Sequence, residues 1–163
     1  MVYVVSENTS VKIYIAGPDV FRTDAQSWAV SVRAACAALG HEALVPLDGD
    51  AATAAGIYAN NIAMIRTADA VVANLNPFRG AEPDSGTCFE VGFALALGKR
   101  VVGYVRSEET LLARVQRMQG LDGTGGPLDA DGLLIENFGL PLNLMLAEPL
   151  QLVRSFEAAL AIL

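Results

Sequence analysis

The fold is decided first by residues 11–18, which read VKIYIAGP. The segment Val11–Ala16 is short, apolar and rich in β-branched residues, and Gly17-Pro18 ends it, so the sequence predicts a buried strand there. A second run, DAVVANL, occupies Asp69–Leu75. Its nearly continuous apolar character is typical of a parallel strand that is covered on both faces.

The rest of the chain alternates between similar strands and helices. The remaining strands are short apolar runs, predicted at Ala43–Val45, Arg100–Val105 and Leu133–Asn137. Apolar residues at helical spacing predict helices at 23–39, 51–68, 87–97, 108–118 and 148–163. Such alternation predicts an α/β fold, specifically a flavodoxin-like, doubly wound, five-stranded parallel sheet with helices on both faces. We expect a single domain over residues 1–163, with residues 1–10 as a candidate N-terminal extension.

Composition and charge exclude several classes of protein. The 163 residues are 53% hydrophobic and 18% charged, which argues against disorder. The net charge of −7 disfavours binding to nucleic acid. No apolar run is long enough for a membrane helix, and the start of the chain lacks a basic signal-peptide region. We therefore expect a cytoplasmic protein with no nucleic-acid and no membrane partner.

The sequence also lacks the motifs of metal and nucleotide sites. Cys36 and Cys88 have no C-x-x-C spacing, and His41 is the only histidine, so no metal site is expected. Both cysteines are interpreted as apolar filler in a reducing compartment. Neither G-x-G-x-x-G nor G-x-x-x-x-G-K-S/T occurs, which disfavours nicotinamide and nucleoside-triphosphate enzymes. We expect no cofactor.

The densest group of reactive side chains is EPDSGTCFE, at Glu82–Glu90. Asp84 lies in a loop after a predicted strand and Glu90 lies one turn into the next helix, so both belong to the ligand-binding edge of the sheet. Paired carboxylates suit glycosyl chemistry, in which one attacks the anomeric carbon and the other handles the proton of the leaving group. The positive end of the helix dipole favours an ionised Glu90 as nucleophile, with Asp84 as the acid.

A purely structural interpretation of these residues stays open. Thr87 and Glu90 have the spacing of a capping box, as do Thr23 and Gln26 before the first helix. Spacing alone favours this capping role for Glu90 over a catalytic one. Asp84 also fits an Asx turn.

The sequence resembles the nucleoside 2-deoxyribosyltransferase family over most of its length. The matching segments are KIYIAGPDVF at Lys12–Phe21, NNIAMIRTADAVVANLNPFRG at Asn60–Gly80, EPDSGTCFEVGFALALGKRVVGY at Glu82–Tyr104 and FGLPLNLM at Phe138–Met145. The family is flavodoxin-like, which agrees with the fold predicted above. The resemblance implies an enzyme that moves 2-deoxyribose between purine or pyrimidine bases with retention, through a covalent glycosyl-glutamate. Its small-molecule partners are 2′-deoxyribonucleosides and free nucleobases.

The resemblance assigns catalytic roles to three residues. Glu90 matches the nucleophile, Asp84 matches the residue that protonates the base, and Tyr14 matches a tyrosine that orients the nucleophile. On the residues alone, Tyr14 is equally a core side chain of a buried strand.

Six substrate-binding positions follow from the same resemblance. They are Gly17, Phe21, Asn61, Gly86, Asn143 and Met145. Asn143 and Met145 match residues that a neighbouring subunit supplies, which implies a homo-oligomer of two or more chains. Asn61 stands where some members carry an aspartate beside the base, so base preference is not predicted. Considered without the resemblance, Phe21 fits helix packing and Asn143 fits a helix cap.

Two other functions remain compatible with the sequence. An N-glycosidase would use the same carboxylates but let water attack, acting on deoxynucleosides or their 5′-monophosphates. Ser85 and Arg79 are the only nearby candidates for contacting such a phosphate. A non-catalytic nucleotide-sensing module on the same fold would bind ligand without turnover, with Glu90 as a cap.

Overall fold

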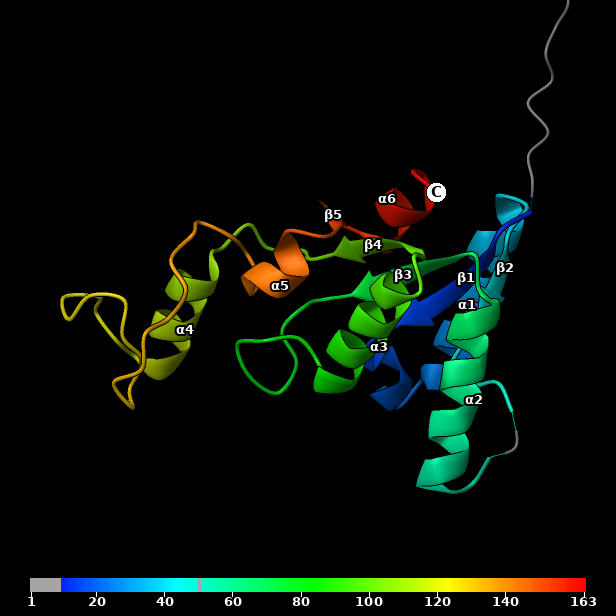
Figure 1. The fold of residues 1–163 in the computed structure, drawn as a ribbon, viewed down its shortest axis with the longest axis horizontal. Coiled ribbons are helices and arrows are strands. Elements are labelled where there is room, and N and C mark those ends of the chain that lie inside the picture. The colour runs from blue at the N-terminus through cyan, green and yellow to red at the C-terminus, as the bar shows by residue number, and fades with distance from the viewer. Residues whose placement is uncertain (1–9, 50) are drawn as a thin grey trace, which may run out of the picture.

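A computed structural model describes residues 10–49 and 51–163 of the chain. Its centre is a five-stranded sheet, parallel throughout, in the order β2-β1-β3-β4-β5 (Figure 1). The strands are β1 Lys12–Ala16, β2 Glu42–Leu44, β3 Ala70–Asn74, β4 Arg100–Tyr104 and β5 Gln151–Val153. The predicted flavodoxin-like fold class is therefore confirmed. The candidate extension at residues 1–10 lies almost wholly outside the described residues.

Helices cover both faces of the sheet. On one face α1 (Ala25–Ala38) and α6 (Phe156–Leu160) pack on side chains such as Ile13 and Ile15. On the other face α2 (Ala54–Thr67), α3 (Ser85–Ala96) and α5 (Leu144–Ala147) pack around Tyr14. Successive residues of β1 point to opposite faces, as a pleated strand requires. The short 3-10 helix η1 (Pro18–Phe21) follows β1 directly.

The core depends on the central strand and on one glycine. All five residues of β3 are buried, and each fully buried valine contributes about 1.5–3 kcal/mol by leaving water. A Cβ on Gly103 in β4 would lie 2.7 Å from Cδ1 of Leu75 and 2.8 Å from Cδ2 of Leu152. The glycine therefore leaves the room that lets β5 lie against β4 with its leucine packed inward.

The last strand and the last helix differ from the sequence prediction. The predicted strand at Leu133–Asn137 is wrong, because that segment makes only an isolated bridge between Leu128 and Leu134. The fifth strand is Gln151–Val153, inside the predicted helix at 148–163. Its backbone pairs with Val102–Tyr104 along the edge of the sheet. Three residues are too few to show the alternation typical of a strand, so the sequence could not indicate this one. It forms because its backbone pairs with β4 in the folded chain.

Both predicted capping boxes are also wrong. The N-cap of α1 is Asp24 and not Thr23, and it makes no capping hydrogen bond. Its carboxylate instead accepts two hydrogen bonds from Arg22, at 2.8 and 2.9 Å. The N-cap of α3 is Asp84 and not Thr87. A carboxylate can cap a helix as well as a hydroxyl can, so the later threonine was not needed.

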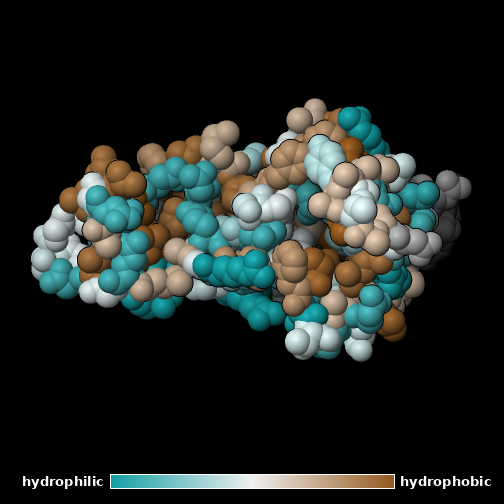
Figure 2. All heavy atoms as spheres, turned by 90° about the horizontal axis from the view of Figure 1, so that it is seen from below, coloured by the Kyte–Doolittle hydropathy of each residue, from teal (hydrophilic) through white to brown (hydrophobic). Residues whose placement is uncertain are grey.

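Helix α4 (Leu111–Gln119) and the segment after it lie at one end of the molecule (Figure 1). Arg114, only 1% exposed, anchors this part by donating hydrogen bonds to the carbonyls of Ala81, Glu109 and Pro141. The surface carries hydrophobic patches on this end and on the main body (Figure 2). Among the described residues, no helix combines the length and apolar character needed to span a bilayer.

Candidate active site

Six of the predicted site residues line one cavity at the carboxyl edge of the sheet. The cavity has a volume of about 160 Å³. Its lining residues are Gly17, Val20, Phe21, Pro46, Asn61, Asp84, Gly86, Thr87 and Glu90. They come from the segments after β1 and β2, from α2 and from the start of α3. Larger cavities exist elsewhere in the described chain. This cavity is therefore chosen as the candidate site because it contains the two carboxylates, and not because of its size.

Glu90 is held by two hydrogen-bond donors on the same oxygen. The hydroxyl of Tyr14 donates to Oε1 at 2.6 Å, and Nδ2 of Asn61 donates to the same atom at 3.4 Å. The other oxygen, Oε2, has no hydrogen-bond partner among the described residues. Tyr14 is fully buried on the face of β1 that α3 covers, which is why its hydroxyl reaches Glu90. One carboxylate oxygen is thus fixed while the other stays unengaged.

Burial raises the pKa of Glu90 to about 7. This value is the net result, because the hydrogen bonds from Tyr14 and Asn61 lower the pKa and the nearby charge of Asp84 adds to the rise. A pKa of about 7 leaves this carboxyl about half ionised at neutral pH, so the ionised nucleophile stays a prediction. Glu90 is the sixth residue of α3 and so lies beyond the first turn, where the dipole acts most strongly, and desolvation dominates. The pKa of the Tyr14 hydroxyl is also raised, mainly by burial, so this group remains a proton donor.

Asp84 is anchored through one oxygen to the start of α3. Its Oδ2 accepts hydrogen bonds from the backbone N–H of Thr87 at 2.9 Å and from the Thr87 hydroxyl at 3.0 Å. Oδ1 has no hydrogen-bond partner among the residues described. A Cβ on Gly86 would come within 3.1 Å of Oδ2, so a glycine there keeps this arrangement free of crowding. The capping role predicted for Thr87 and Glu90 thus belongs to Asp84.

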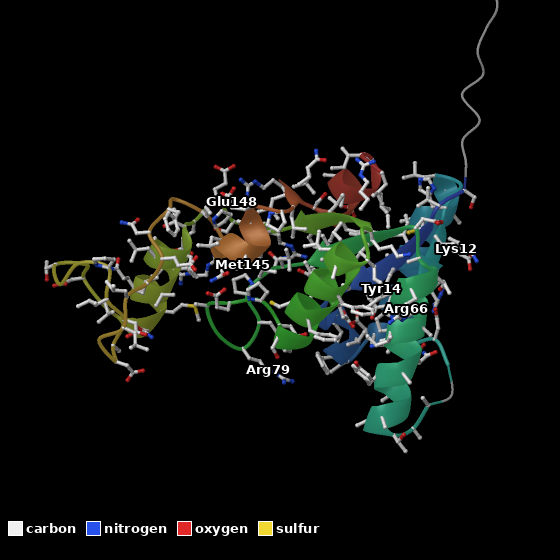
Figure 3. The ribbon with its side chains drawn as sticks, in the orientation of Figure 1. Lys12, Tyr14, Arg66, Arg79, Met145 and Glu148 are labelled. Carbon is white, nitrogen blue, oxygen red and sulfur yellow. The ribbon has the colours of Figure 1, made fainter. Side chains whose placement is uncertain are left out.

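Phe21 forms an aromatic wall of the cavity. Its ring stacks on Phe78, with centroids 5.5 Å apart and an angle of 15° between the planes. The guanidinium of Arg79 lies 4.6 Å from the Phe78 centroid and 5.2 Å from the Phe21 centroid. Figure 3 shows Arg79 on the loop between β3 and α3. Such a cation over stacked rings stabilises the wall, by about 0.5–1 kcal/mol for an exposed contact.

Gly17 brings the end of β1 close to β3. A Cβ at this position would lie 2.8 Å from Cβ of Asn74, which is only 7% exposed. Asn74 donates from Nδ2 to Oδ2 of Asp19 at 2.6 Å and so ties η1 to the end of β3. The glycine therefore permits the close contact that sets the floor of the cavity.

Asn143 and Met145 lie outside this cavity within the same chain. Oδ1 of Asn143 caps α5 by accepting from the backbone N–H of Met145 at 2.9 Å, and Nδ2 donates to Oε1 of Glu136 at 2.7 Å. Met145 is 73% exposed. In Figure 3, Met145 and Tyr14 lie on opposite sides of α3. The capping interpretation of Asn143 is confirmed for the single chain.

Three lining residues were not predicted as site residues. Thr87 was interpreted only as a cap, although it lies inside the same motif as both carboxylates. Pro46 directly follows a predicted strand, and ligand sites gather after strand ends, so its position was a usable signal. Val20 has no such signal, because its place depends on how η1 folds after Gly17.

A family model and a solved structure at 42% identity match this chain and name the same kind of protein. The model of the family "Nucleoside 2-deoxyribosyltransferase" matches residues 13–145, a range that includes all nine predicted site residues. A solved 2-desoxiribosyltransferase from Leishmania mexicana is 42% identical, with a TM-score of 0.79, covering 93% of this chain and 95% of that one. A solved 2-deoxyribosyltransferase from Bacillus psychrosaccharolyticus is 23% identical, with a TM-score of 0.48, over 60% of this chain and 74% of that one. An uncharacterised protein of Schizosaccharomyces pombe is 28% identical over 155 residues, or 82% of this chain and 74% of that protein.

Proposed function

The chain belongs to the nucleoside 2-deoxyribosyltransferase family, and from this premise we propose that it transfers 2-deoxyribose between nucleobases through a covalent intermediate on Glu90. The observation that carries the proposal is the carboxylate pair in one cavity, with Oε1 of Glu90 held by Tyr14 and Oε2 unengaged. Fixing one oxygen directs the other toward the substrate, and such pre-orientation lowers the barrier to attack.

In the first step, Oε2 of Glu90 attacks C1′ of the deoxyribonucleoside. The bond between C1′ and the base nitrogen breaks, the electron pair goes to the base, and Asp84 gives the base a proton. This step needs Glu90 ionised and Asp84 protonated, so the pair carries one proton in its working state. The unengaged Oδ1 of Asp84 is the oxygen suited to proton transfer, because Oδ2 is occupied by Thr87.

In the second step, a nitrogen of the incoming base attacks C1′ from the face that the first base left. The bond between C1′ and Oε2 breaks, Glu90 recovers its carboxylate, and Asp84 accepts the proton of the incoming base. Two inversions give net retention of configuration. The ring of Phe21, which lines the cavity and stacks on Phe78, supports this assignment because a flat base packs well against an aromatic ring.

We further propose that the active enzyme is a homo-oligomer in which a neighbour supplies Asn143 and Met145. The resemblance implies that a neighbour's Asn143 lies near the nucleophile and the sugar 5′-hydroxyl, with Met145 as the adjacent contact, and neither residue lines the cavity of its own chain. Exposed apolar side chains surround this segment, including Phe138 at 66% and Leu134 at 79% exposure. Large exposed apolar groups mark surfaces that bind other proteins.

The hydrolase alternative gains no specific support from the cavity. Ser85 and Arg79, its two candidate phosphate contacts, are not among the lining residues. Arg79 instead lies over the Phe21–Phe78 stack.

The transfer reaction is tested by mixing thymidine or 2′-deoxyinosine with adenine in phosphate-free buffer and separating the products by chromatography. We expect new deoxyadenosine from the wild type, none from Glu90→Ala, and a loss of at least about a hundredfold in rate for Asp84→Asn. Asp131→Asn, an exposed carboxylate outside the cavity, serves as the matched control and should keep full activity. Free base and deoxyribose without deoxyadenosine would indicate the hydrolase instead, and an active Glu90→Ala would refute the covalent step.

The shared site is tested by complementation between two inactive variants. Glu90→Ala removes the nucleophile, and Asn143→Ser removes the amide but keeps a residue that can cap α5. If each site combines residues of two chains, mixing both variants with subunit exchange restores about a quarter of the wild-type sites in a two-fold dimer. Wild type that is active as a strict monomer would contradict the proposal.

A further inference from the structure

A second cavity, of about 240 Å³, lies at the same edge of the sheet but on the face covered by α1 and α6. We refer to it as the aromatic cavity, because Trp28, Tyr104 and Phe156 line it. The rings of Tyr104 and Phe156 meet edge to face, with centroids 6.2 Å apart. None of its lining residues belongs to the catalytic cavity. The family resemblance assigns no site role to any residue of this cavity.

The aromatic cavity is lined by a tyrosine whose hydroxyl has no hydrogen-bond partner among the described residues. Tyr104 is only 7% exposed, yet its hydroxyl makes no hydrogen bond to any residue in the described ranges. The hydroxyl oxygen is not among the fully buried polar atoms, so a ligand in the cavity can reach it. Burial also raises the pKa of Tyr104, so the hydroxyl is protonated and able to donate. The indole N–H of Trp28 likewise has no hydrogen-bond acceptor within the described residues. Two donors that no described residue engages are therefore available to the acceptor atoms of a ligand.

The charges around the aromatic cavity are balanced. Arg22 and Arg106 contribute two positive charges, and Asp19 and Glu157 contribute two negative charges. Arg22 is already engaged with Asp24 at 2.8 Å. The two acidic groups would repel a phosphate or carboxylate ligand. A neutral ligand with hydrogen-bond donors and acceptors along its edge could bond to both the acidic and the basic side chains.

The volume restricts the ligand to a small one. Pockets for drug-sized ligands usually span about 300–1,000 Å³, and the aromatic cavity lies just below that range. One flat mono- or bicyclic ring fits such a space between aromatic walls, whereas the two acidic groups disfavour an anionic nucleotide.

We propose that the aromatic cavity is a second, non-catalytic binding site for a neutral, planar nitrogen heterocycle of the nucleobase class, which accepts a hydrogen bond from Tyr104. The proposal does not rest on the transfer reaction, because it is argued only from residues outside the catalytic cavity.

Trp28 makes the test direct, since it is the only tryptophan of the chain. The probes are adenine and, separately, inorganic phosphate, titrated while the tryptophan fluorescence is excited at its red edge. We expect saturable quenching by adenine in the wild type and also in Glu90→Gln, which alters the catalytic cavity alone. Phosphate should leave the fluorescence unchanged.

Two variants locate the binding. Ala35→Leu fills the aromatic cavity from α1 and should abolish the quenching. Tyr104→Phe removes only the donor and should weaken binding by about five- to tenfold. Tyr58→Phe, an exposed tyrosine on α2, is the matched control and should bind like the wild type.

Four outcomes would overturn the proposal: no saturable quenching by adenine, quenching unaffected by Ala35→Leu, quenching lost in Glu90→Gln, or quenching by phosphate instead of adenine. Loss in Glu90→Gln would place the ligand in the catalytic cavity. Because the readout is fluorescence, absence of deoxyribosyl transfer would refute the proposed function and leave this site standing.

Discussion

Replacing Glu90 by glutamine should remove activity and at the same time stabilise the fold at alkaline pH. Burial raises the pKa of this carboxyl from its usual 4.5 to about 7. Glu90 therefore keeps its proton to a higher pH in the folded than in the unfolded chain. The folded state accordingly loses stability as the pH rises from about 4.5 to about 7, and the loss is complete above that range.

The magnitude follows from the size of this change. Each tenfold change in an acid dissociation constant corresponds to about 1.4 kcal/mol, so the penalty at pH 8 is about 3 kcal/mol. Glutamine is not ionisable and avoids it. Its amide oxygen can still accept from Tyr14, and its amide hydrogens can donate to Oδ1 of Asn61, a buried atom with no partner among the residues described. We expect Glu90→Gln to be up to about 3 kcal/mol more stable than the wild type at pH 8, and nearly equal to it at pH 4.5.

The assay is urea unfolding of both proteins at pH 4.5 and pH 8, at one fixed protein concentration because an oligomer's stability depends on concentration. Glu42→Gln is the matched control, since the Glu42 side chain is 55% exposed and its one ion pair within the described residues is with Lys12, at 3.9 Å. It should change the free energy of unfolding by less than about 0.5 kcal/mol at either pH. An equal free energy of unfolding for wild type and Glu90→Gln at pH 8 would refute the desolvation of Glu90.

Three further predictions concern the groups around Glu90 and the anchor of α4. Since the working state carries one proton on the carboxylate pair, kcat/KM should fall as the pH rises through about 7, and Tyr14→Phe should move that fall to higher pH because the hydrogen bond that lowers the pKa of Glu90 is lost. The pH dependence of kcat/KM, measured for both proteins, tests this prediction. The same pH dependence in Tyr14→Phe and wild type would mean that Tyr14 does not contact the working carboxylate. Gly17→Ala should place a Cβ 2.8 Å from that of Asn74, costing about 1–3 kcal/mol of stability and raising KM for the base. Thermal unfolding and steady-state kinetics test the Gly17→Ala prediction. An unchanged Tm and an unchanged KM would show that the ends of β1 and β3 can move apart without cost. Arg114→Ala should cost about 3 kcal/mol in urea unfolding, because three backbone carbonyls lose their donor, and a loss below about 1 kcal/mol would contradict that anchor.

Most of the fold was predictable because the signals were local. Four strands were found from apolar runs, and the helices between them from their spacing, since both patterns are written in consecutive residues. The fifth strand, Gln151–Val153, was not found, because three residues on the edge of a sheet carry no periodicity of their own. It exists because β4 offers unpaired backbone groups and Gly103 leaves room for Leu152.

Much of the candidate site was predictable for the same reason. Topology alone brings the ends of parallel strands to one edge, so residues after a strand, such as Gly17, and residues at the start of the next helix, such as Asp84, were expected to meet. The roles of these residues remain predictions until the transfer assay is done.

By itself the sequence determined the parallel sheet, the family resemblance and the pair of carboxylates, because each depends on residue types at fixed spacing. Only the tertiary structure decided which carboxylate caps α3, how strongly burial raises the pKa of Glu90, and that Tyr14 and Asn61 share one of its oxygens. It alone also revealed the aromatic cavity, whose walls come from segments far apart in the chain. The physical reason is that desolvation and side-chain convergence depend on all surrounding groups at once, and no local pattern records them.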